Sequence, residues 1–412
     1  MARIIGGVGV SHTPTIGYAF DRALQDDPAW KPMFDNFKGV QVWLDEAAPD
    51  VLFTIYNDHI SSFFFDHYSA FALGVDERYS PADEGGGERD LPPIAGHAAL
   101  ARHIGSSLMA DEFDMAFFRN KPLDHGCLSP LSMMNLDQGG WKKPIIPLQV
   151  GVLQFPIPTA RRCFRLGRAL RRAVESFPED LKVAVVATGG LSHQVHGERA
   201  GFNAPQWDQE FLDLLVADPD ALTRLTHADY ARLGGAESVE VIMWLIMRGA
   251  MGGPVQELQR SYYLPSMTAI ATLVLAPEVR SEAVAEPQVD QLAGAETLEG
   301  TYPFTLETLA GAYDLNVYLH RLVDPAHRAA FLTDPVGAMT AFGLADADQR
   351  LICDRDWQGL IHRGVTFFVL EKLGAVLGIP NMAIYAGMKG ITLEEMIASR
   401  NTGITYSVAG TR

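Results

Sequence analysis

The chain has 412 residues, of which 48% are hydrophobic and 20% charged, and its formal net charge at pH 7 is −17. This length favours two domains, and the composition is that of a globular protein rather than a disordered one. The negative charge argues against nucleic acid or an anionic membrane as a partner, although a local site can still bind a small anion. No stretch of about 18 apolar residues is available to span a membrane. The three cysteines lie far apart, which predicts a cytoplasmic protein without disulfide bonds or a thiolate zinc site.

Two apolar segments near the start of the chain each run directly into a histidine. Residues 3–10 read as a buried, glycine-rich strand, and Pro14 prevents that strand from continuing beyond His12. Residues 50–58 repeat the plan and deliver His59. The carboxyl ends of strands are where α/β sheets collect ligands. A single histidine can simply cap a turn, but the repeated layout leads us to interpret His12 as the first ligand of a metal site.

A third strand-like segment, residues 181–188, also ends near a histidine. A Gly-Gly turn separates it from Ser192 and His193. A serine beside a histidine suggests a hydrolase, but adjacent residues usually point apart and the Gly-x-Ser-x-Gly elbow of such enzymes is missing. The strand-end histidine is therefore the more informative feature of this segment.

Between and after these strands the pattern predicts an alternation of helices and strands. Helices are expected at residues 32–48, 96–110, 158–177, 205–217 and 219–226. Further strands are expected at residues 114–119, 141–150, 258–264 and 269–275.

Two segments are predicted to be irregular. Residues 79–93 contain three consecutive glycines and three prolines, a composition typical of a lid or binding loop when such a segment is ordered. Residues 121–130 have proline on both sides of Asp124 and His125. His125 can hydrogen-bond Asp124 there or lie in another polar pocket.

A carboxylate completes the candidate metal site. Residues 234–248 predict a helix that carries Glu237 and Glu240 in its first turn and is almost wholly apolar afterwards. Such a helix is buried, and a buried carboxylate needs a partner, which a metal would supply. Together with His12 and His59, either glutamate makes the two-histidine, one-carboxylate set that binds non-haem Fe(II) with open coordination positions.

The C-terminal third of the chain has a different texture. Residues 277–299 are rich in Ala, Glu, Pro and Gln, and we interpret them as a linker that follows a catalytic domain at residues 1–276. Residues 300–412 contain short helical patterns without β-rich runs, which predicts a small all-α domain. The helices are expected at residues 306–323, 326–332, 335–342, 347–359, 365–377 and 392–399.

Five short motifs carry a resemblance to a known family. They are Ser-His-Thr-Pro at 11–14, Asn-Asp-His at 57–59, Asp-His-Gly at 124–126, Gly-Gly-Leu-Ser-His at 189–193 and Ala-Glu-Ser-Val-Glu at 236–240. In combination they resemble the type II extradiol dioxygenases of the protocatechuate 4,5-dioxygenase superfamily. Residues 300–412 resemble the small helical subunit of that enzyme, notably at Asp354–Ile361 and Asn381–Met388. Catalytic and small subunits would thus be fused in one chain.

The resemblance implies a fold and a set of site residues. The catalytic domain is expected to be α/β, with a three-layer α/β/α arrangement around a mostly β core, followed by the all-α domain. Within that fold, His12, His59 and Glu240 would bind Fe(II). His193 would act as the general base, and His125 would hydrogen-bond a substrate hydroxyl or bound oxygen.

The resemblance also implies a reaction, namely extradiol cleavage of gallate by O2 to 4-oxalomesaconate in the breakdown of lignin-derived aromatic acids. Protocatechuate and 3-O-methylgallate differ from gallate by one substituent and stay open as substrates. Two functions of other classes are the alternatives: a zinc-dependent hydrolase that uses the same site, and a catalytically silent binding protein.

Four further residues are expected to bind the substrate. Thr268 would anchor its carboxylate, while Glu371 in an apolar helix, Tyr385 in a glycine-flanked loop and Tyr406 near the C-terminus would close the site. We expect a homodimer in which each helical domain caps the neighbouring subunit's site. Capping of the chain's own site is the alternative.

Overall fold

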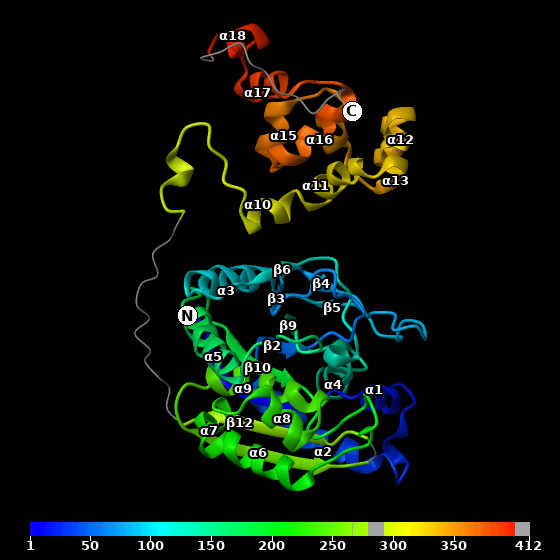
Figure 1. Ribbon diagram of the computed structural model, residues 1–412, viewed down its shortest axis with the longest axis vertical. Helices are drawn as coiled ribbons and strands as arrows, with labels where there is room; N and C mark the ends of the chain where they lie inside the picture. The colour runs from blue at the N-terminus through cyan, green and yellow to red at the C-terminus, as the bar shows by residue number, and fades with distance from the viewer. Residues whose placement is uncertain (266, 279–291, 400–412) are drawn as a thin grey trace. The chain divides into compact units, whose positions relative to one another are not determined.

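The computed structural model describes residues 1–265, 267–278 and 292–399. The chain divides into two compact units, Met1–Val289 and Asp290–Arg412, which are drawn in Figure 1 and are described here one at a time. Most of the linker expected at residues 277–299 lies outside the described residues, as does Tyr406.

The first unit is built on an eight-stranded mixed sheet with the strand order β11-β12-β1-β10-β2-β9-β3-β6. Its four central strands, β1, β10, β2 and β9, are mutually parallel, and β12 and β3 flank them in antiparallel pairing. The strands are β1 (Arg3–Val10), β2 (Val51–Tyr56), β3 (Phe71–Gly74), β6 (Ala116–Phe118), β9 (Ile145–Val150), β10 (Lys182–Thr188), β11 (Val255–Tyr263) and β12 (Ile270–Pro277).

Helices cover both faces of this sheet, and each face has its own apolar core. One core contains side chains of α3 (Ala98–Ala110), α5 (Ala160–Glu175), α6 (Pro205–Ala217) and α9 (Ile242–Ala250). The other contains side chains of α1 (Pro14–Asp21), α2 (Lys31–Ala47) and α4 (His125–Asn135). Along β2, Phe53 and Ile55 join the first core while Leu52 and Tyr56 join the second. The three-layer α/β/α architecture expected from the sequence is confirmed.

The parallel pairing of the central strands decides where the site lies. Because β1, β2 and β10 run in the same direction, the segments that carry His12, His59 and His193 all begin at one edge of the sheet. Shorter elements complete the unit: η1 (Leu24–Asp26), β4 (Arg78–Tyr79), β5 (Ile94–Ala95), β7 (Leu136–Asp137), β8 (Gly140–Trp141), α7 (Pro219–Thr223), α8 (His227–Gly234) and η2 (Glu237–Val241).

The sequence prediction was wrong about two local structures beside this edge. The segment expected to be irregular between its prolines starts helix α4 at His125, because the Asp124 side chain accepts a hydrogen bond from Gly126 N–H and caps the helix. Pro130 lies inside that helix. The single helix expected at residues 234–248 begins instead with the 3-10 turn η2, so Glu240 lies on a tighter turn than predicted.

The second unit is wholly helical within residues 292–399, as expected for the C-terminal domain. Its elements are η3 (Ala295–Thr297), α10 (Leu306–Gly311), α11 (Tyr313–His320), η4 (Arg321–Val323), α12 (Pro325–Thr333), α13 (Pro335–Phe342), α14 (Asp346–Cys353), α15 (Trp357–Arg363), α16 (Phe367–Leu377), α17 (Asn381–Lys389) and α18 (Leu393–Ala398). Tyr318, Leu360, Leu370, Leu373 and Ile384 are among the fully buried side chains of its core.

Tyr385 lies on helix α17 and not in the loop that its neighbouring glycines suggested. A side chain at Gly387 would come within 2.4 Å of Trp357, so this glycine allows close helix packing and does not break the helix. Gly390, with φ of +67°, ends the helix in the left-handed conformation that glycine adopts most easily.

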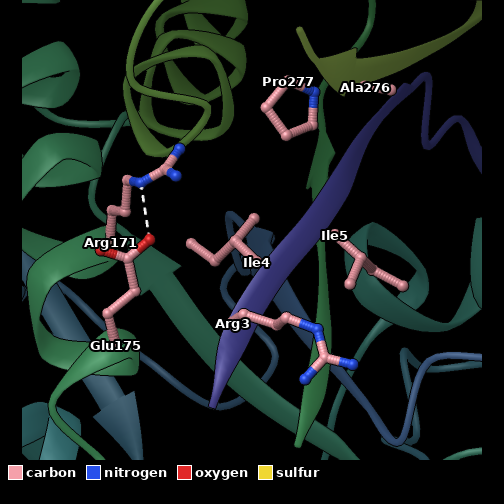
Figure 2. A pocket seen from close by; sticks show the side chains of 7 residues that line it. All are labelled: Arg3, Ile4, Ile5, Arg171, Glu175, Ala276 and Pro277. Atoms are coloured by element: carbon pink, nitrogen blue, oxygen red, sulfur yellow. Dashed lines mark ion pairs between the residues drawn. The ribbon is translucent and has the colours of Figure 1, made fainter. Parts of the chain in front are cut away.

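A cavity of about 270 Å³ lies at the amino end of β1, away from the end that leads to His12. Figure 2 shows its lining, which consists of Arg3–Ile5, Arg171, Glu175, Ala276 and Pro277. Arg171 Nε and Glu175 Oε1 form an ion pair of 2.8 Å within it.

Among the described residues, the helices are too short or too polar to cross a membrane. The three cysteines are free thiols.

Candidate metal centre and active site

His12, His59 and Glu240 converge at the carboxyl edge of the sheet. Each offers one ligand atom, and these three atoms lie within 4.8 Å of one another. His12 follows β1, His59 follows β2 and Glu240 lies in η2. The His12 and Glu240 side chains are 4% and 5% exposed, and His12 Nε2 lies 3.2 Å from Glu240 Oε1. The donor set has the composition that suits Fe(II) and other divalent transition metals.

Both imidazoles are held through the ring nitrogen that faces away from the metal position. His12 Nδ1 lies 2.8 Å from Thr188 Oγ1, and His59 Nδ1 lies 2.9 Å from Asp124 Oδ2. Because a carboxylate oxygen can only accept, His59 Nδ1 carries the proton and its Nε2 is left with a lone pair. Metal-binding histidines in proteins are oriented in this way, so the residues present fit a metal ion.

Glu240 is a buried carboxylate surrounded by hydrogen-bond donors and imidazoles. Burial acts to raise its pKa, but His12, His193 and His59 outweigh that effect and lower the pKa of Glu240 to about 2. Gly190 N–H donates to Glu240 Oε1. A Cβ at Gly190 would lie 3.0 Å from that oxygen and 2.9 Å from the His193 ring, so a glycine is needed for this close approach.

Glu237, the rival carboxylate in the sequence, is engaged elsewhere. Its two oxygens accept hydrogen bonds from the backbone N–H groups of Val195 and His196, at 3.1 and 3.3 Å. It therefore secures the loop after His193, and the geometry favours Glu240 as the ligand.

Two more histidines lie beside the candidate ligands. The His125 ring stacks on His59 with centroids 4.0 Å apart, and its centroid lies 6.2 Å from that of His12. His193 Nε2 lies 3.8 Å from Glu240 Oε1, while His193 Nδ1 lies 2.7 Å from the carbonyl oxygen of Leu191. That carbonyl fixes Nδ1 as the donor, so Nε2 has the lone pair that a general base requires.

Comparison with known proteins identifies the family. Residues 6–274 match the family described as the catalytic LigB subunit of aromatic ring-opening dioxygenase. The chain belongs to the aromatic ring-opening dioxygenases. Residues 315–401 match a second family, the LigA subunit of the aromatic-ring-opening dioxygenase LigAB. The resemblance drawn from the five sequence motifs is confirmed, and with it the presence of both subunit types in one chain.

Curated relatives agree with this assignment. Gallate dioxygenase of Pseudomonas putida is 60% identical over 337 residues, which cover 80% of this chain and 98% of that protein. A 2,3-dihydroxyphenylpropionate/2,3-dihydroxicinnamic acid 1,2-dioxygenase of Photorhabdus laumondii is 26% identical over 311 residues, or 64% of this chain and 94% of the relative. The protein of the same name from Escherichia coli is 30% identical over 190 residues, covering 45% and 55% of the two chains.

In this ring-opening dioxygenase, Ser192 is part of a structural network. Its N–H and O–H donate to Asp208 at 2.7 and 2.6 Å, and Tyr262 O–H donates to the same carboxylate at 2.8 Å. Burial raises the pKa of Asp208. The serine is thus bonded to a carboxylate and not to His193, which removes the arrangement that a serine hydrolase would need. Sequence reasoning missed Asp208, because it lies on an ordinary amphipathic helix.

Two carboxylates meet at the amino end of α4. Asp124 holds His59 through Nδ1 and N–H, and Glu84 holds His125 through the same two groups. Asp124 is fully buried, and although burial acts to raise its pKa, the hydrogen bond from His59 lowers it. Sequence reasoning also missed Glu84, because it lies in a glycine-rich loop.

The predicted substrate-binding residues are placed only in part. Thr268 is half-buried, and its Cγ2 would lie 2.7 Å from a Cβ at Gly190, so it borders the site. In the helical unit, Glu371 on α16 accepts a hydrogen bond of 2.6 Å from Asn381 Nδ2. The Tyr385 ring packs against Phe367 with centroids 5.1 Å apart. The roles of all three stay predictions.

Proposed function

We propose that this enzyme cleaves the ring of gallate with O2, outside the diol, at an Fe(II) held by His12, His59 and Glu240. The observation that carries the proposal is the convergence of two oriented imidazoles and one buried carboxylate at the carboxyl ends of the parallel central strands. The name of the 60% identical relative supports gallate as the substrate. The product would be 4-oxalomesaconate, which contains both atoms of O2 and requires no external reductant.

Bound Fe(II) would act as a Lewis acid and transfer electron density between the ring and O2. The protein residues would manage protons and orientation. His193 Nε2 would accept a proton from a substrate hydroxyl as the catechol binds, since its Nδ1 is committed to the Leu191 carbonyl. His125, stacked on His59, would hydrogen-bond another substrate oxygen.

The remaining polar groups of gallate call for further partners. Thr268 would bind the carboxylate, and Glu371, Tyr385 and Tyr406 would close the pocket from a helical domain. The match of residues 315–401 to the LigA subunit supports a capping role for this domain. We propose a cytoplasmic homodimer in which each helical domain caps the neighbouring subunit's site.

Subunit exchange tests the cap. A His12→Ala variant and a Glu371→Ala/Tyr385→Ala double variant are each expected to be inactive and to recover partial activity when mixed. Recovery follows because one heterodimer site combines an intact metal centre with an intact cap. Exchange demonstrated by mass spectrometry without recovery would place the cap over the chain's own site.

Oxygen uptake tests the reaction itself. Metal-free protein would be reconstituted anaerobically with Fe(II) or Zn(II) and offered gallate, protocatechuate and 3-O-methylgallate in turn. We expect the Fe(II) protein, and not the Zn(II) protein, to take up one O2 per gallate. Two labelled atoms from ¹⁸O2 should enter the product. A clear preference for either of the other two acids would reassign the substrate. Failure of the Fe(II) protein to consume O2 with all three acids would refute the proposal.

A further inference from the structure

The arm formed by residues 80–93 has a defined shape although it contains three consecutive glycines. It projects from the first unit between β4 and β5 (Figure 1). Asp83 Oδ1 accepts hydrogen bonds from the N–H groups of Gly85 and Gly87 at 2.8 and 3.0 Å, and Asp83 pairs with Glu88 in a β-bridge. Both glycines have φ of +93°, which few other residues tolerate. The tip of the arm is therefore a closed turn.

Both ends of the arm are tied to the catalytic unit. On one side, Ala82 N–H donates to the Leu123 carbonyl at 2.8 Å, and Leu123 N–H donates to the Ser80 carbonyl at 2.9 Å. On the other side, Arg89 forms a two-pronged ion pair with Asp21, with Nε and Nη2 2.7 and 2.6 Å from the two carboxylate oxygens. These ties place the turn beside the residues that lead into α4.

The turn presents Glu84 to His125. Glu84 Oε1 accepts from His125 N–H at 2.9 Å, and Glu84 Oε2 bonds His125 Nδ1. The two side chains are 32% and 13% exposed. Asp124 Oδ2 lies farther away, 4.0 Å from His125 Nδ1, and already accepts both hydrogen bonds from His59. Glu84 is thus the acid that holds this ring.

We infer that Glu84 is a positioning residue that makes His125 Nδ1 the hydrogen-bond donor and leaves His125 Nε2 as the nitrogen that meets the substrate. This inference rests on the proposed function. A neutral imidazole exists in two tautomers, and a carboxylate, which only accepts, selects the one protonated on Nδ1. Asp124 selects the same tautomer of His59, so each of the two stacked rings has its own carboxylate at the amino end of α4.

Two substitutions at Glu84 separate the hydrogen bond from the charge. Glu84→Ala removes both acceptors and is expected to lower kcat/KM for gallate by about 10- to 100-fold, by analogy with the loss of carboxylates that orient metal-binding histidines. Glu84→Gln keeps one acceptor oxygen for the two donors of His125, the backbone N–H and Nδ1, and its kcat/KM is expected to fall less. Iron content should be unchanged in both variants, because Glu84 touches none of the three proposed ligands. Glu88→Gln, on the exposed part of the same turn, is the matched control and should behave as the wild type.

A spectroscopic measurement on the metal-free protein tests the tautomer without any turnover. The protein would be labelled with ¹⁵N-histidine, and the His125 ring signals would be assigned through a His125→Gln variant. The wild type is expected to show the proton on Nδ1, and Glu84→Ala is expected to show a shift toward Nε2 protonation or a mixture.

Loss of kcat/KM at normal iron content, together with the altered ring signals and partial rescue by Gln, supports the inference. Wild-type kcat/KM in Glu84→Ala overturns it. Unaltered ring signals in Glu84→Ala also overturn it, and a lower Tm alongside would indicate a purely structural role. If the wild type consumes no O2 with gallate, the proposed reaction fails, while the ring signals still decide whether Glu84 sets the His125 tautomer.

Discussion

Replacement of Asp124 by asparagine should weaken metal binding, because Asp124 holds the candidate ligand His59. Asp124 Oδ2 accepts from His59 N–H at 2.7 Å and from His59 Nδ1 at 2.9 Å, and Oδ1 accepts from Gly126 N–H at 3.0 Å. Since asparagine offers one acceptor oxygen, its amide NH2 must face at least one of these donors. A buried donor left without a partner costs about 1–3 kcal/mol of folding free energy.

The effect on the metal can be estimated separately. Loss of a carboxylate that orients and polarises a metal-binding imidazole weakens binding about 10- to 100-fold, which equals about 1.4–2.7 kcal/mol. We therefore expect Asp124→Asn to raise the apparent Kd for Fe(II) by that factor, measured anaerobically against a competing chelator. Thermal unfolding of the metal-free protein would report the folding cost independently.

Asp58, which precedes His59 in the loop after β2, offers a matched control. Like Asp124, this carboxylate is buried and accepts several hydrogen bonds. Its donors are the backbone N–H groups of Ser61, Ser62 and Phe63, at 3.0 to 3.2 Å, and none of them belongs to a candidate ligand. Asp58→Asn should destabilise the metal-free protein to a similar degree and leave the Fe(II) affinity unchanged. Equal Fe(II) affinity in Asp124→Asn and the wild type, or an equal loss in both variants, would refute the reasoning.

Three further predictions address the base, the substrate carboxylate and the Ser192 network. His193→Ala should keep its iron and lose on the order of 10² to 10⁴ in kcat, whereas an iron-free variant would make His193 a ligand. Thr268→Val should raise KM for gallate more than it lowers kcat, and an unchanged KM would exclude Thr268 from the carboxylate site. Burial raises the pKa of Asp208 above 3.8, so its stabilising contribution is greatest below that pH and is lost as the pH rises through the raised value. The stability of the wild type relative to Asp208→Asn should accordingly fall in denaturant unfolding as the pH is raised above about 4, and a constant difference would contradict this.

The architecture was largely accessible from the sequence because it depends on local patterns. Apolar runs that stop at a histidine predicted β1, β2 and β10, and the parallel pairing of these strands then brings their ends together. The change of texture after the last strand likewise predicted the helical unit. These features depend on hydrophobic periodicity and on punctuation by Pro and Gly, which a single sequence displays.

The partners of the site histidines were not accessible in this way. Thr188 lies 176 residues from His12 along the chain, and Glu84 lies 41 residues from His125. Such contacts are created by tertiary folding, and the spacing of residues contains no trace of them. Tyr385 illustrates the opposite error, since its flanking glycines predicted a loop, whereas Gly387 lies within α17 and lets that helix approach Trp357.

The position of β1 in the sheet has a consequence for how the protein is made. β1 is the first strand of the described chain, yet its two neighbours are β10, at residues 182–188, and β12, at residues 270–277. On a ribosome, β1 therefore has no neighbouring strand until β10 has been synthesised, and it has both neighbours only after β12, near the end of the first unit. His12 waits with it, and Glu240 is also made late. A nascent chain stalled before β12 would contain β10 but lack the second strand partner of β1, so metal uptake should follow completion of the unit rather than accompany its synthesis.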